Sequence, residues 1–208
     1  VPESLGVTPV AHHYAHGLFG AVASGFDEAA VLVVDGMGES QSISIYRFGG
    51  GALRRVFTLG PRSSLGLWYS LVTAHLGFLP NGDEYKVMGL APWGDPEPFA
   101  DAVARTVVLD HSGVSVPLLS WADGNHEYVE SLAWLARHTV PRRRAADDLS
   151  QVHADLAAAV QQRLSASLVH LARVAAQLTG AGRLVVCGGV ALNCAAIGDL
   201  ARLGLFDE

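Results

Sequence analysis

The sequence predicts an α/β domain, and three stretches of the chain carry this prediction. Residues 29–35 form a continuous apolar run that ends on an aspartate, the pattern of a central strand buried on both faces. Residues 148–179 predict a long core helix, because six apolar side chains recur at spacings of three and four, namely Val152, Leu156, Val160, Leu164, Leu168 and Leu171. Residues 183–186 form a second short apolar run after that helix and read as another buried strand.

The composition indicates a globular protein that binds a small molecule. Half of the 208 residues are hydrophobic, which is enough for a sizeable core. The formal net charge is −6 and the only basic run is 142–144, so nucleic acid is not a predicted partner. No apolar run reaches the roughly 18 residues of a membrane span, and no charged-then-apolar leader opens the chain. We therefore expect a cytoplasmic location and no membrane partner.

Three of the nine histidines cluster near the start of the chain, at His12, His13 and His16. Residues 10–24 read as a helix, which places His12 and His16 on one face about one turn apart. This spacing suits a two-histidine metal clamp, but no glutamate lies between the ligands to act as the base of a metallopeptidase. A third ligand, usually a carboxylate, would have to come from elsewhere. A surface histidine pair is the alternative.

A glycine-containing turn at residues 35–39 (DGMGE) follows the first buried strand. Its two glycines allow a ligand to approach the backbone, and Asp35 and Glu39 can hold a cation or polarise water. A plain hairpin turn would explain the glycines equally well. Residues 41–48 and 52–59 then predict an antiparallel meander. By fold analogy alone, an actin-like or sugar-kinase-like ATPase lobe begins in this way.

The middle of the chain predicts short helices and then an irregular insertion. Helices are expected at 64–77, capped by Ser64, at 84–91 and at 96–105. Lys86 could pair with a phosphate, although a solvated surface lysine is the more frequent case. Residues 107–147 lack a clear period and are expected to form an insertion shaped for a substrate or partner.

A second glycine-containing turn, CGGVALN at residues 187–193, joins the second buried strand to a helix that runs through residue 203. Glycines at such a junction let a nucleotide lie against the backbone, and Asn193 can hydrogen-bond a ribose or a base. A tight strand-to-helix turn is the structural alternative.

Five motifs, HHYAH, DGMGE, SLGLWYSLVTAHLGF, EYKVMGLAPWG and CGGVALN, occur in this order across nearly the whole chain. With them the sequence resembles the O-carbamoyltransferases of antibiotic and nodulation-factor biosynthesis, and specifically the middle of their larger domain. That domain is similar to the universal tRNA threonylcarbamoyl-transfer protein and to one domain of the hydrogenase-maturation carbamoyltransferase. The resemblance implies an actin-like fold of the ASKHA, ribonuclease-H-like class, of which residues 1–208 would be an incomplete central segment.

The resemblance also implies a two-stage reaction. A smaller adenylate-forming domain of the same full-length chain would make carbamoyl-adenylate from carbamoyl phosphate and ATP. The present domain would pass the carbamoyl group to a hydroxyl of a small-molecule acceptor of the natural-product class. A divalent metal is implied, with iron(II) ahead of zinc, and both suit histidine and carboxylate ligands.

Particular residues receive roles by their match to the family motifs. His12 and His16 would be metal ligands, and His13 matches a motif position that makes it a candidate catalytic residue. The remaining matches would hold carbamoyl-adenylate. In the phosphate and carbamoyl region these are Asp35, Gly36, Gly38 and Glu39. Those that flank the nucleotide are Gly82 and Lys86, and those that hold the adenosine are Gly188, Gly189 and Asn193.

The chain also departs from the family pattern. The third metal ligand of the family is an aspartate shortly beyond the GGVALN helix, and this chain stops at Glu208 before such a motif. The N-terminal strands and the adenylate-forming domain are missing too, so the isolated segment is expected to be inactive and to form a homodimer through an exposed sheet edge. The alternatives are an actin-like or sugar-kinase-like ATPase that would not need the histidine pair, and a catalytically inert assembly domain.

Overall fold

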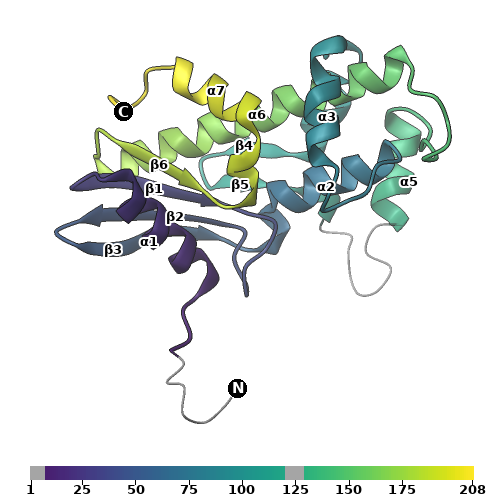
Figure 1. Cartoon of the computed structure of the whole chain (residues 1–208). Helices are drawn as coiled ribbons and strands as arrows, with labels where there is room; N and C mark the ends of the chain where they lie inside the picture. The colour runs from purple at the N-terminus through teal and green to yellow at the C-terminus, as the bar shows by residue number, and fades with distance from the viewer. Residues whose placement is uncertain (1–7, 120–128) are drawn as a thin grey trace.

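The computed structural model describes residues 8–119 and 129–208, and it centres on a four-stranded mixed sheet in the order β3-β2-β1-β6 (Figure 1). The strands β1 (Glu28–Val34), β2 (Ile43–Gly49) and β3 (Ala52–Leu59) form an antiparallel meander. The fourth strand, β6 (Leu184–Cys187), pairs in parallel with β1. The prediction that this strand is buried is wrong, because it lies at one edge of the described sheet and its residues are only half-buried. The predicted α/β class is confirmed, whereas the actin-like assignment stays a prediction.

Helix α1 (His12–Ser24) packs on one face of the sheet and helix α6 (Gln151–Thr179) packs on the other (Figure 1). The inner face of α1 buries His13, Gly17 and Ala21, which recur every four residues. A Cβ atom on Gly20 would lie 2.9 Å from the Cys187 sulfur, so a glycine there lets α1 lie close to β6. The helix begins at His12 and not at residue 10 because Ala11 has an extended backbone.

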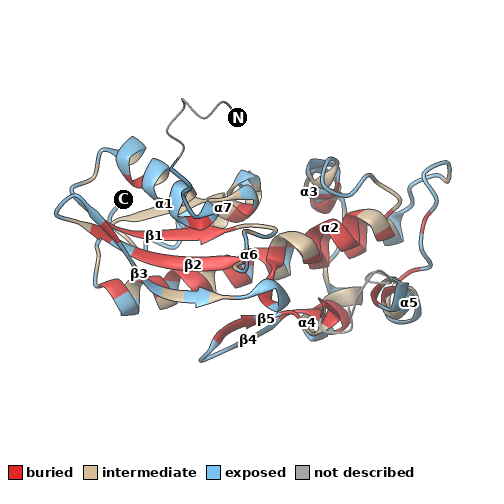
Figure 2. Cartoon of the chain, turned by 90° about the horizontal axis from the view of Figure 1, so that it is seen from below, coloured by how far each residue is buried: buried red, intermediate tan, exposed pale blue. Residues whose placement is uncertain are grey.

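Strand β1 lies at the centre of the core. Residues 29–34 are fully buried, as their continuous apolar run predicts, and Figure 2 shows the burial concentrated along β1 and β2. Helix α2 (Leu65–His75) is buried almost all round, because Trp68, Leu71 and Val72 are each at most 2% exposed although they point in different directions. The core therefore extends beyond the sheet along α2.

Helix α6 supplies most of the opposite wall of the core. Five of its six predicted core residues are at most 1% exposed, namely Leu156, Val160, Leu164, Leu168 and Leu171. The prediction for Val152 is wrong, because this side chain in the first turn of the helix is 46% exposed. Within 8–119 and 129–208, no helix is both long enough and apolar enough to cross a membrane, and this includes the 29 residues of α6.

The remaining elements cluster around α2 and α6, and α2, α3 and α5 gather beyond one end of the sheet (Figure 1). The expected insertion at 107–147 is more regular than predicted, since it contains a hairpin and a helix. Its residues 120–128 lie outside the described residues. These elements are α3 (Glu84–Leu90), α4 (Ala100–Thr106), β4 (Val108–Asp110), β5 (Gly113–Ser115), α5 (Val129–His138) and, after β6, α7 (Cys194–Arg202).

Candidate functional site

The first turn of α1 meets the end of β1, and there His12, His16 and Asp35 converge. The Nε2 atom of His12 lies 2.7 Å from Oδ2 of Asp35, and Nε2 of His16 lies 3.3 Å from the same oxygen. The two Nε2 atoms are 3.1 Å apart. One potential ligand atom from each residue lies within 4.8 Å of the other two. The fold therefore brings two imidazoles and a carboxylate to one point.

The carboxylate of Asp35 is held in place by the two glycine-containing turns. Its Oδ1 atom accepts hydrogen bonds from the backbone N–H groups of Gly36 (2.8 Å) and Gly189 (3.1 Å). Oδ2 is thereby left to face the histidines. Partial burial raises the pKa of Asp35, but hydrogen bonds from His12, Gly36 and Gly189 outweigh this effect and lower the pKa overall. The carboxyl group is ionised at neutral pH.

This donor set fits a divalent cation. Zinc–nitrogen and zinc–oxygen bonds of about 2.0–2.2 Å place neighbouring ligand atoms of a tetrahedral site roughly 3.3 Å apart. The three separations of 2.7 to 3.3 Å are close to that value. Three protein ligands also leave a coordination position open for a substrate. From the sequence, Asp35 was expected to hold a cation or polarise water, and the family resemblance placed it in the phosphate and carbamoyl region. Neither argument paired it with His12 and His16, because its place beside them arises from the tertiary structure.

A cavity of about 470 Å³, here called the Asp35 cavity, opens beside this cluster. It lies between the β1 and β6 turns, α2 and the start of α3. Gly66 of α2 also lines the cavity, and it lies so close to the first turn that a Cβ atom on it would be 2.7 Å from the Gly36 Cα. The cavity wall contains five of the residues predicted to hold carbamoyl-adenylate: Asp35, Gly36, Gly82, Gly189 and Asn193.

Gly38 and Glu39, at the far end of the first turn, do not line the Asp35 cavity. Gly38 lies against α1, where a Cβ atom would come within 3.0 Å of the His13 ring. Glu39 accepts a hydrogen bond from the backbone N–H of His12 at 3.0 Å. These two residues thus join the turn to the start of α1.

Gly188 and Lys86 also lie away from the wall of the Asp35 cavity. Gly188 has a φ of +93°, and a Cβ atom there would collide with the Val34 backbone, so the turn after β6 requires glycine. The Lys86 ammonium group forms an ion pair with Asp83 at 3.0 Å. Glu84, two residues before Lys86, does not pair with it. Glu84 instead accepts hydrogen bonds from Ser70 and from the backbone of Asn81, and it lines the Asp35 cavity.

Asn193 is held by a network that the sequence did not reveal. Its Oδ1 atom accepts hydrogen bonds from the Ala196 N–H at 3.0 Å, which caps α7, and from the Gln161 amide at 2.9 Å. Its Nδ2 atom donates to Gln161 Oε1 at 3.0 Å, and the Tyr69 hydroxyl donates to the same oxygen. Tyr69 belongs to a quoted motif, but Gln161 lies inside a long helix with no signal to single it out.

His13 lies outside the metal cluster, because successive residues of a helix point about 100° apart. Its side chain is directed at the sheet, with Nδ1 2.9 Å from the Ser44 hydroxyl, and the residue is only 1% exposed. Burial lowers the pKa of His13, which favours the neutral imidazole. His13 therefore differs from His12 and His16 in both direction and environment.

Comparisons with known proteins identify the family of the chain. The family model described as "Carbamoyltransferase N-terminus" matches residues 5–208. The chain is 33% identical over 200 residues to nodulation protein NolNO of Sinorhizobium fredii, covering 96% of this chain and 28% of that protein. It is 34% identical over 203 residues to the uncharacterized protein sll1178 of Synechocystis, covering 94% of this chain and 32% of that protein.

A third relative is nodulation protein NolO of Bradyrhizobium diazoefficiens, which is 32% identical over 197 residues. That match covers 95% of this chain and 34% of the relative. The chain therefore spans about a third of the length of these curated relatives. Since the family model and the relatives both match nearly the whole chain, it belongs to the carbamoyltransferase family, in the region described as the N-terminus.

Proposed function

We propose that this chain is the part of an O-carbamoyltransferase that holds carbamoyl-adenylate and passes its carbamoyl group to a hydroxyl of a small molecule. The observation that carries the proposal is the double position of Asp35, which belongs both to the histidine cluster and to the wall of the Asp35 cavity. A ligand in that cavity would therefore lie beside the cation-binding atoms. Membership of the carbamoyltransferase family supports the choice of group transferred.

In this proposal His12, His16 and Asp35 hold a divalent cation, iron(II) or else zinc. When bound, the cation supplies a Lewis acid beside the carbamoyl and phosphate oxygens. The glycines at 36, 82 and 189 leave room for the adenylate along the cavity wall. Glu84 lines the same wall, and its Oε1 accepts the two hydrogen bonds described above. Its other oxygen is positioned to accept a ribose hydroxyl.

The transfer step needs an acceptor hydroxyl placed against the carbamoyl carbon. The acceptor oxygen forms a bond to that carbon while the bond between the carbon and the phosphate oxygen breaks. AMP leaves with the electron pair, and the hydroxyl proton passes to solvent. We further infer an actin-like fold, a cytoplasmic location, and an adenylate-forming domain elsewhere in the full-length protein as the source of carbamoyl-adenylate.

The test uses the complete protein with carbamoyl phosphate, ATP and a panel of alcohols, and mass spectrometry detects a carbamoyl mass gain on an acceptor. Asp35→Asn should abolish the gain, because the variant loses the charged ligand of the cluster. The matched control, Asp27→Asn, changes an exposed aspartate just before β1 and should retain full activity.

Two results would contradict the proposal. Equal product formation by the wild type and Asp35→Asn would remove Asp35 from the reaction. ATP hydrolysis that survives in Asp35→Asn, without carbamoyl transfer by either protein, would favour the actin-like ATPase instead.

A further inference from the structure

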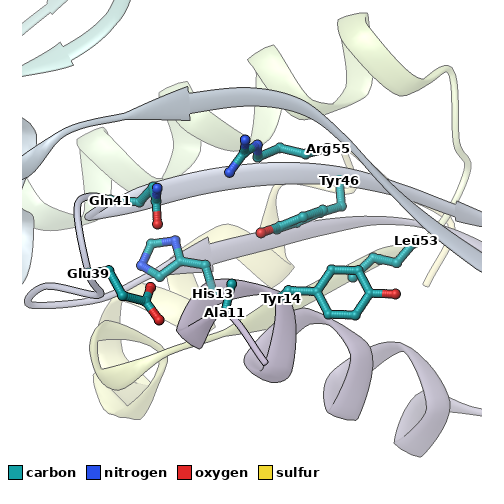
Figure 3. A pocket seen from close by; sticks show the side chains of 8 residues that line it. All are labelled: Ala11, His13, Tyr14, Glu39, Gln41, Tyr46, Leu53 and Arg55. Carbon is teal, nitrogen blue, oxygen red and sulfur yellow. The ribbon is translucent and has the colours of Figure 1, made fainter. Parts of the chain in front are cut away.

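A second cavity, of about 550 Å³, lies between α1 and strands β2 and β3 and is here called the His13 cavity (Figure 3). Figure 3 shows the His13 ring between Glu39 and Gln41, with the Tyr46 hydroxyl and the Arg55 guanidinium group turned toward the same space. The cavity lies beyond the far end of the first turn, whereas Asp35 and Gly36 at its near end line the Asp35 cavity.

One nitrogen of the His13 ring is engaged by the sheet. Its Nδ1 atom lies 2.9 Å from the Ser44 hydroxyl, which in turn lies 3.3 Å from the Thr58 hydroxyl. The other nitrogen, Nε2, takes no part in these contacts.

Nε2 of His13 is buried and has no hydrogen-bond partner among the residues that the structure describes. Buried polar atoms in proteins are almost always paired, so an unpaired nitrogen in a cavity wall indicates a missing hydrogen-bond partner. The side chains beside it are Glu39, which is exposed, and Gln41, which is half-buried. A hydroxyl group is a suitable partner, because it can both donate and accept a hydrogen bond.

The charges of the His13 cavity suit an uncharged ligand, and the cavity lies close to the metal-binding cluster. Its wall carries one carboxylate, Glu39, and one guanidinium group, Arg55, whose charges offset each other. Glu39 is bonded to the His12 backbone, and the His12 and His13 rings are 5.9 Å apart between centroids. A ligand in the His13 cavity would therefore lie one side chain away from the metal-binding cluster.

We propose that the His13 cavity binds the acceptor alcohol, whose hydroxyl forms a hydrogen bond with Nε2 of His13. This inference rests on the proposed carbamoyl transfer and adds a separate site for the second substrate. The two substrates would then approach from opposite ends of the turn at residues 35–39. Arg55, Tyr46 and Gln41 would contact the rest of the acceptor.

A pair of substitutions separates this role from a purely structural one. In His13→Gln the amide can place a hydrogen-bonding group near the position of Nε2. In His13→Asn the shorter amide can keep the bond to Ser44, but no polar group remains at the position of Nε2. We expect the KM for the acceptor to rise at least tenfold in His13→Asn and much less in His13→Gln, with the KM for ATP unchanged in both. A structural role predicts the reverse order or equal values, and either result would overturn the proposal.

Arg55 provides a second test that does not disturb the core. Arg55→Ala should raise the KM for the acceptor several-fold, and the control Arg54→Ala, which changes an exposed neighbour outside the cavity wall, should not. Saturation-transfer NMR with the same alcohol panel follows binding even if no carbamoyl transfer is detected. Binding that Arg55→Ala weakens and Arg54→Ala does not would support the acceptor site while the proposed reaction fails. Equal binding by both variants, or none by the wild type, would reject the site.

Discussion

The histidines of α1 and the buried His75 of α2 show how differently one residue type is used in this chain. His12 and His16 share a carboxylate oxygen of Asp35, and His13 lines a cavity. His75 is completely buried, with Nε2 2.9 Å from the Val140 carbonyl oxygen, and it lines neither cavity. The nitrogen atoms of His12 and His16 are available to a cation, whereas His13 and His75 are almost fully buried and each keeps one ring nitrogen without a partner among the described residues. The direction of each ring and the cluster or cavity that it faces, and not histidine itself, indicate function here.

The largest expected effect follows from removing the accessible histidines. His12→Ala/His16→Ala in the complete protein should abolish the binding of about one divalent metal ion per chain and stop carbamoyl transfer, because only the Asp35 carboxylate would remain. Elemental analysis measures the metal. His111→Ala, at an exposed histidine outside the cluster, is the control and should keep its metal. Unchanged metal content in the double variant would remove the histidine pair from the site.

His75 should instead make the stability of the fold depend on pH. Burial lowers the pKa of His75 from 6.5 to about 4, so between these values the unfolded chain binds a proton that the folded chain does not. Stability should therefore fall as the pH drops from 6.5 to 4, by on the order of 3 kcal/mol at most. Urea unfolding at several pH values measures the slope.

His75→Gln is the matched variant for this measurement, since its amide can still donate to Val140 but does not titrate. His13 and His153 also have lowered pKa values and contribute in the same direction, so the slope should decrease and not vanish. An identical slope in the variant would show that His75 does not titrate differently in the two states. His75 would then differ less from the histidines of α1 than its burial suggests.

A smaller effect is expected at Asn193, whose Oδ1 and Nδ2 atoms are both hydrogen-bonded within the protein. Asn193→Ala removes the cap of α7 and the pair with Gln161, so it should cost about 1–2 kcal/mol of stability. Titration with AMP should also show weaker binding, by roughly 1–3 kcal/mol. Gln161→Ala breaks the same pair but leaves the cap, so its loss of stability should be smaller. Equal stability of wild type and Asn193→Ala would argue against the network.

The smallest effect is expected at Lys86, whose only ion pair among the described residues is with Asp83. Lys86→Met should leave the unfolding midpoint unchanged and weaken AMP binding modestly, most at low salt, where its charge is least screened. Asp83→Asn releases the same ammonium group and should strengthen AMP binding under those conditions. If neither variant alters affinity at two ionic strengths, Lys86 does not contact the nucleotide.

Much of the fold could be read from local patterns. The run at 29–34 predicted a strand buried on both faces, and the spacing of leucines and valines predicted α6, because the period of apolar residues records which sides of an element face the core. Val152 shows the limit of this rule. It fits the period of α6, yet its side chain in the first turn is 46% exposed, because the period does not tell where along a helix the core begins.

The sequence by itself determined the pair of histidines one turn apart and the two turns that end apolar strands, because both depend on neighbouring residues. Only the tertiary structure decided what these pieces meet. Asp35 reaches His12 because β1 ends beside the start of α1, and it accepts the Gly189 N–H across 154 residues because β6 pairs with β1. The Nδ1 atom of His13 meets Ser44 of β2 because α1 packs on that face of the sheet, while its Nε2 has no partner among the described residues. Such contacts arise from the packing of distant elements, which no local period encodes.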